Sequence, residues 1–110
     1  MKQSLLNRIS EHVYWLSPDG ATDRPTLGAI VGKRATLIVD AGNSAAHAKL
    51  FLGELAKLET AKPKYVMLTH WHWDHVFGAS AFEVPIFACH ETQRVIEEMA
   101  HLLLHSLRFI

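Results

Sequence analysis

Residues 69–79 read THWHWDHVFGA, and this stretch decides how the rest of the chain is interpreted. Imidazole nitrogens and carboxylate oxygens are good ligands for zinc, iron and manganese. A polar loop that faces solvent is the simpler alternative, but it gives no reason for such tight spacing directly after an apolar run. The stretch therefore predicts a metal-binding loop. Its candidate ligands are His70, His72, Asp74 and His75.

The spacing of these residues also predicts how they divide between metal ions. In an extended backbone, residues two apart point to the same side, so His70, His72 and Asp74 would converge while His75 pointed elsewhere. One metal ion could then be held mainly through His70 and His72, and another through Asp74 and His75. Two metal ions about 3.5–4 Å apart can share a bridging hydroxide and stabilise a leaving group.

Strands and helices are predicted on both sides of the metal loop. Glycine at position 32 lies in a short connection between two apolar runs, which predicts a β-hairpin. A helix is expected from Asn43 or Ser44 to about Leu58, because either residue is a good N-cap and the apolar residues after it share one face. A second helix is expected at about residues 91–107. The expected strands cover residues 12–16, 26–31, 35–40, 65–68 and 84–88.

This order of elements predicts an α/β, or α+β layered, fold. Residues 65–68 (YVML) are wholly apolar, which is typical of a buried strand with elements packed on both faces. The metal loop begins directly after this strand, and α/β sheets place their chemistry in loops at strand ends. A chain of 110 residues is expected to form a single domain over residues 1–110.

Composition excludes few partners but favours some over others. Eleven basic residues balance eleven acidic ones and do not cluster, so no nucleic-acid-binding face is favoured. No apolar run has the length of a membrane span or a signal peptide. Cys89 is the single cysteine, which excludes an internal disulfide and a Cys-rich zinc site. A cytoplasmic setting is therefore expected.

The motif formed by His70, His72, Asp74 and His75, before Gly78 and Ala79, resembles the metal motif of the metallo-β-lactamase superfamily. The strand end at residues 37–42 (LIVDAG) and the helix after it resemble the same family, so the resemblance covers essentially the whole chain.

The resemblance implies a role for each of these side chains. His70 and His72 would bind one metal ion, and Asp74 and His75 the other. Asp74 would also be catalytic, handling a proton. Asp40 would lie behind the ligands and orient the metal loop, as metal-binding histidines normally require of a neighbour. Zinc is the expected metal, with two ions in the complete domain, and iron or manganese is possible.

The same resemblance implies hydrolysis. Flavodiiron members carry an acid where this chain has His72, so hydrolytic or mononuclear iron dioxygenase chemistry is favoured over diiron oxygen reduction. The motif with Trp73 inside it resembles that of hydroxyacylglutathione hydrolases (the glyoxalase II type) and related small-molecule hydrolases, which implies a small-molecule substrate. Trp73 is a possible pocket residue. The expected reaction is attack of a metal-bound hydroxide on an ester, thioester, amide, lactam or phosphoester. The alternatives are an iron-dependent dioxygenase and a non-catalytic metal-binding or dimerising half-domain.

The family's domain is an αβ/βα sandwich roughly twice as long as this chain, which would correspond to the N-terminal half. The second half of the family's domain supplies a third histidine, a bridging aspartate and a last histidine, for which this chain has no evident counterpart. A half-sandwich would expose apolar faces that a second copy could cover. His90 is expected in the substrate pocket or as a helix N-cap, and His101 and His105 on a helix surface.

Overall fold

The computed structural model of the protein describes residues 5–107, with side chains described as far as residue 100. The strands are β1 (Leu6–Arg8), β2 (Val13–Leu16), β3 (Leu27–Val31), β4 (Thr36–Val39), β5 (Pro63–Met67) and β6 (Ile86–Phe87). The helices are α1 (Ala45–Ala56), α2 (Trp73–Val76) and α3 (His90–Leu107), with 3-10 turns η1 (Gly20–Thr22) and η2 (Ala79–Phe82). The predicted α/β fold class is confirmed.

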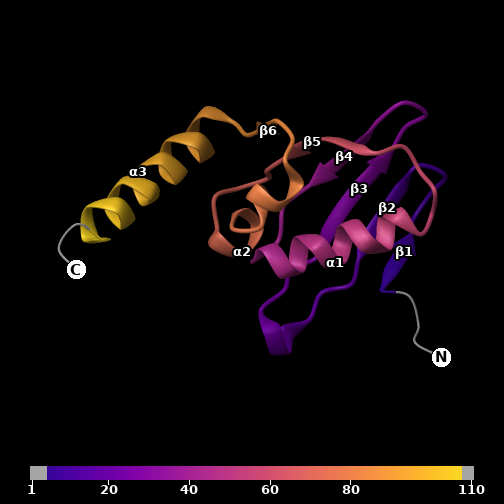
Figure 1. The fold of residues 1–110 in the computed structure, drawn as a ribbon, viewed down its shortest axis with the longest axis horizontal. Coiled ribbons are helices and arrows are strands. Elements are labelled where there is room, and N and C mark those ends of the chain that lie inside the picture. The colour runs from indigo at the N-terminus through magenta and orange to yellow at the C-terminus, as the bar shows by residue number, and fades with distance from the viewer. Residues whose placement is uncertain (1–4, 108–110) are drawn as a thin grey trace.

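Within residues 5–107 the strands form one sheet in the order β1-β2-β3-β4-β5-β6. Neighbouring strands from β1 to β4 are antiparallel, whereas β4, β5 and β6 run parallel. Figure 1 shows α1 lying along one side of this sheet and α3 extending away from it. The sequence therefore changes from hairpin connections to crossover connections after β4, and the metal loop follows β5 at the carboxyl end of a parallel strand.

Two local predictions are confirmed in detail. The expected hairpin is formed by β3 and β4, and its turn is closed by the Gly32 amide, which donates to the Ala35 carbonyl at 2.9 Å. Helix α1 begins after Ser44, whose hydroxyl accepts from the His47 amide at 3.1 Å as an N-cap. Because α1 starts directly after β4, its N-terminus lies close to the loop that carries the candidate ligands.

The core lies between α1 and one face of the sheet. Phe51 of α1 and the strand residues Leu27, Ile38 and Val66 all have an exposed fraction of 0%. Full burial of such side chains contributes roughly 1.5–3 kcal/mol each. This covered face fixes the position of α1 and therefore of the loop before it.

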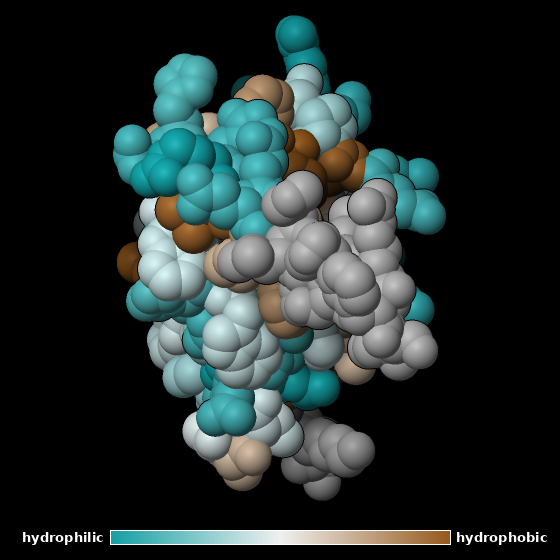
Figure 2. Space-filling view, turned by 90° about the vertical axis from the view of Figure 1, so that its left-hand side faces the viewer, coloured by the Kyte–Doolittle hydropathy of each residue, from teal (hydrophilic) through white to brown (hydrophobic). Residues whose placement is uncertain are grey.

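The opposite face of the sheet is apolar but open. Tyr65, Met67 and Phe87 are 44%, 41% and 54% exposed, whereas Val66, which points to the α1 side, is buried. The prediction that residues 65–68 pack on both faces is therefore wrong for this chain, because alternate strand residues face opposite sides and α1 covers only one. Figure 2 shows further hydrophobic residues at the surface on the side that carries α3.

One strand and one helix were not predicted from the sequence. Strand β1 has the sequence Leu-Asn-Arg, which is too short and too polar to be recognised as a strand. Helix α2 is a single turn inside the metal loop, where an extended backbone was expected. The predicted second helix is present as α3, and the side chains of His101 and His105 lie outside the described residues. None of the helices within residues 5–107 has the length and apolar character needed to span a lipid bilayer.

Candidate metal centre

The metal loop is extended only as far as His72, which precedes the first residue of α2. The turn of α2 then brings His75 back against His70, with 4.1 Å between their ring centroids. The ring of His72 packs edge-on against the ring of His70, with 4.7 Å between their centroids. The expectation that His75 would point elsewhere is therefore wrong, because α2 replaces the two-residue period of a strand with that of a helix.

Asp40 follows the last residue of β4, and its side chain forms hydrogen bonds with the loop that carries the histidines. Its Oδ1 accepts from the Thr69 amide at 2.8 Å, and its Oδ2 accepts from His75 Nδ1 at 2.9 Å. Because a carboxylate only accepts, His75 Nδ1 carries a proton in this bond, and the neutral form of the ring then has its lone pair on Nε2. Asp40 is 5% exposed and has a φ of 68°, a left-handed backbone that non-glycine residues rarely adopt.

Thr69 extends the reach of Asp40 to a second histidine. Its hydroxyl lies 2.8 Å from Asp40 Oδ2 and 2.7 Å from His70 Nδ1. When the hydroxyl donates to the carboxylate, it accepts from His70 Nδ1, which leaves His70 Nε2 free to bind metal. Thr69 was not singled out in the sequence, although it directly precedes the first histidine of the motif.

Backbone contacts lock α2 onto the loop before α1. The Ala41 amide donates to the His75 carbonyl at 2.8 Å, and the Gly78 amide donates to the Gly42 carbonyl at 3.0 Å. A Cβ at Gly78 would lie only 2.2 Å from the Ala41 carbonyl oxygen, so position 78 requires glycine. The histidines are therefore held by the two loops that follow β4 and β5. Because these strands are parallel, both loops begin at the same end of the sheet.

The donor atoms in this cluster fit a divalent metal ion. Asp40, His70 and His75 offer ligand atoms that lie within 4.8 Å of one another. Asp40 is already engaged by Thr69 and His75, so we assign it to support rather than to ligation. His72 and Asp74 are not in this set of described residues, although Asp74 Oδ2 lies 3.8 Å from His75 Nε2, and their ligand roles stay predictions. A nitrogen and oxygen set of this kind suits zinc, iron or manganese.

A buried histidine also lies next to this centre. His47 is fully buried, packs against Gly42, and its Nδ1 accepts from the Asn43 amide at 3.2 Å. Burial lowers the pKa of His47 to about 4, with smaller contributions from the charges of Arg24 and His75. His47 therefore stays neutral at neutral pH and supports the loop before α1 by packing.

Two residues, Trp73 and His90, were predicted to line a substrate pocket. Trp73 lies within the metal motif, whereas His90 lies further along the chain. Trp73 is 45% exposed on α2, with its ring 5.9 Å from that of Phe77, and it lines a groove beside Asp74. His90 is exposed at the first residue of α3. A pocket role for either residue stays a prediction.

Comparison with known proteins identifies the family. Residues 23–100 match the sequence model of the metallo-beta-lactamase superfamily, and the chain belongs to that superfamily. No curated protein sequence matches the chain. The match to solved metallo-beta-lactamases covers the N-terminal part of their domain, as the resemblance implied.

Several solved structures share this fold at low sequence identity. A metallo-beta-lactamase from Pontibacter korlensis is 22% identical with a TM-score of 0.71, covering 84% of this chain and 46% of that one. One from Hirschia baltica is 18% identical with a TM-score of 0.73, covering 86% and 47%. FIM-1 from Pseudomonas aeruginosa, in its mono-zinc form, is 13% identical with a TM-score of 0.69, covering 84% and 45%. The chain therefore spans about half the length of these structures.

Proposed function

We propose that this chain carries one half of the metal centre of a metal-dependent hydrolase. His70, His72, Asp74 and His75 are its metal ligands. The observation that supports this most strongly is the support of two histidines by one carboxylate. Asp40 bonds His75 directly and reaches His70 through Thr69, which leaves the Nε2 atoms of both rings free to bind metal.

Held by these residues, a zinc, iron or manganese ion would act as a Lewis acid and would lower the pKa of a coordinated water towards ~7. The residues of the chain then have separate tasks. The histidines bind, Asp40 and Thr69 orient them, and the Asp74 carboxylate next to His75 accepts a proton. The proposed substrates are small molecules with an ester, thioester, amide, lactam or phosphoester bond. Two zinc ions in the complete domain, and a cytoplasmic setting, stay predictions.

A second candidate function is a metal-binding half-domain without catalysis. The chain spans only 46% of the Pontibacter korlensis structure, and the family's remaining ligands are expected in the other part. In that case a partner would supply those ligands. An iron-dependent dioxygenase can be distinguished from the hydrolase and from the non-catalytic half-domain by two measurements. It would hold iron, and it would consume oxygen.

The first test is metal content, measured by plasma mass spectrometry on untagged protein purified without chelators. We expect at least one equivalent of zinc, iron or manganese per chain. His72→Ala should lower zinc affinity at least tenfold in a calorimetric titration, because it removes a ligand. The matched control is His12→Ala, since His12 is exposed and its ring bonds the Val31 carbonyl away from the centre.

Equal zinc affinity in wild type, His72→Ala and His12→Ala would contradict the ligand assignment. Turnover is then measured on an aryl ester, a thioester, a β-lactam and a phosphodiester. Metal-dependent turnover that His72→Ala abolishes would support the hydrolase. Tight metal binding without turnover on any of the four would favour the non-catalytic half-domain.

A further inference from the structure

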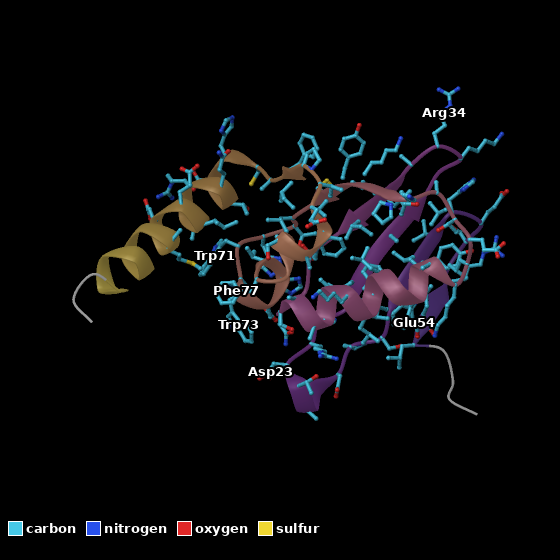
Figure 3. All side chains as sticks on the ribbon, viewed as in Figure 1. Asp23, Arg34, Glu54, Trp71, Trp73 and Phe77 are labelled. Carbon is cyan, nitrogen blue, oxygen red and sulfur yellow. The ribbon has the colours of Figure 1, made fainter. Side chains whose placement is uncertain are left out.

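A groove runs beside the metal centre, between the loop that joins β2 to β3 and the start of α2. It is lined by a short turn, one cation and a tryptophan. Figure 3 shows Asp23 and Trp73 towards the same end of the molecule, whereas Arg34 lies at the far end of the β3–β4 hairpin. The lining residues used below are Asp19, Asp23, Arg24, Trp73 and Asp74. Because Asp74 is a proposed ligand, a molecule in this groove would lie next to the metal.

Arg24 holds a fixed but unsatisfied charge in this groove. Its backbone is clamped to Asp19 by two hydrogen bonds, of 2.8 and 2.9 Å, so its position is set by the turn. Its side chain is half-buried, yet the guanidinium has no hydrogen bond or ion pair with any residue between 5 and 100. By contrast, Arg94 pairs with both Glu91 and Glu98. Partial burial without a partner is costly for a cation, so such a group favours an anion from outside the chain.

The acidic residues of the groove do not neutralise Arg24. Asp19 turns its carboxylate inward, accepting from the Ala21 amide at 3.1 Å and the Thr22 hydroxyl at 2.9 Å. Asp74 faces His75 and the proposed metal. Only Asp23 is left, and it makes no ion pair with Arg24 among the described residues. The lowered pKa of His47 agrees with this arrangement, since the Arg24 charge contributes to it.

Trp73 supplies the second recognition element. Its side chain is 45% exposed and lines the groove. The Phe77 ring lies beside it, with 5.9 Å between the ring centroids. An exposed tryptophan beside a cation suits a ligand with an apolar body and a charged end, because each part then meets a surface of its own kind.

We propose that this groove is the substrate site of the metal centre, and that the substrate is a small molecule whose carboxylate or phosphate group pairs with Arg24 while its apolar part lies on Trp73. This inference rests on the proposed function for its link to catalysis, but its binding chemistry stands on the groove alone. A guanidinium presents a planar pair of donors to either anion.

The test uses three probes of similar shape: phenylacetate, benzylphosphonate and the neutral phenylacetamide. Each is titrated into the zinc-loaded and the metal-free chain, and the indole resonances are followed by proton–nitrogen NMR. Arg24→Gln removes the charge and keeps a polar side chain. Arg34→Gln is the matched control, because Arg34 loses the same charge at a distant turn (Figure 3). Arg24→Lys keeps the charge without the planar donors.

We expect Arg24→Gln to weaken binding of the preferred anion about tenfold, which corresponds to about 1.4 kcal/mol. Arg24→Lys should retain part of that affinity, and phenylacetamide should bind wild type and Arg24→Gln alike. The anion that loses more affinity in Arg24→Gln identifies the substrate as a carboxylate or a phosphate compound.

Equal losses in Arg24→Gln and Arg34→Gln would overturn the proposal, as would anion binding that depends on zinc but not on Arg24. Circular dichroism shows whether Arg24→Gln is folded, and Arg24→Lys supplies the test if it is not. Failure of the hydrolase proposal is distinguishable, because Arg24-dependent anion binding to the metal-free chain would persist in a protein without turnover.

Discussion

The two faces of the sheet are built from similar residues but have different surroundings. On the α1 side, Ile38 and Val66 are fully buried beneath Phe51. On the other side, the paired residues Met67 and Phe87 are 41% and 54% exposed, although both are as apolar as the core residues. The candidate metal centre is supported from the covered side, through Asp40 and the loop before α1. Apolar sequence therefore tells where a strand can be buried, and the packing partner decides whether it is.

The largest expected effect is a difference in stability between substitutions on the two faces of the sheet. Phe51→Ala should lower the free energy of unfolding by about 3–5 kcal/mol, because it leaves a cavity in the core. Phe87→Ala should cost under about 1 kcal/mol, since its ring is half-exposed already. Urea unfolding of both variants measures the difference. Equal losses would contradict it and would indicate that Phe87 is buried in solution, as it would be if the expected second copy covered the open face.

The second prediction concerns how stability depends on pH. The covered side of the sheet encloses the histidine His47, which is fully buried. In the unfolded chain its imidazole gains a proton near its ordinary pKa of 6.5, whereas the folded chain resists protonation until about 4. Stability should therefore be complete above pH 6.5 and fall as pH drops towards 4, by up to about 3 kcal/mol.

Urea unfolding of the metal-free chain between pH 4 and pH 7.5 measures this loss. His47→Asn removes the titration and keeps an acceptor for the Asn43 amide. It should be less stable at neutral pH and lose less stability in acid. A variant with the same pH slope as wild type would show that another group is responsible.

A smaller effect is expected where the covered side supports the metal loop. Asp40→Asn should weaken zinc affinity roughly 10–100-fold, because the histidines lose the carboxylate that orients them. Thr69→Val should weaken it less, because His70 loses its link to the Asp40 carboxylate while the direct bond from His75 to Asp40 remains. Calorimetric zinc titration measures both, with Glu11→Gln as the matched control, because Glu11 is an exposed carboxylate before β2 and does not line the groove beside Asp74. Zinc affinity unchanged in Asp40→Asn would reduce Asp40 to a residue of the strand end.

Much of the fold could be predicted because local signals agree with the packing. The β3–β4 hairpin has its glycine at the turn, and α1 has Ser44 at its N-cap. The open face could not be predicted, since the run at residues 65–68 has the same composition whether one side or both are covered. The exposure of Tyr65 depends on what lies opposite it.

The sequence indicated which residues form the candidate site, but not how their side chains are arranged. The spacing of His70, His72 and His75 indicated metal, but the turn of α2 that brings His75 to His70 depends on contacts with Ala41 and Gly42. Those contacts come from a segment distant in the sequence. Arg24 carried no signal for the same reason, because its groove is formed only when two loops meet.

The bond between Asp40 and His75 joins residues 35 positions apart. An unfolded chain must lose loop-closure entropy before this bond forms, whereas His70 and His72 are neighbours in any conformation. Zinc can therefore bind the unfolded chain through these local histidines as well. It stabilises the native state only by the difference between the two affinities. The carboxylate of Asp40, although it is not proposed to touch the metal, thus decides how strongly zinc favours folding.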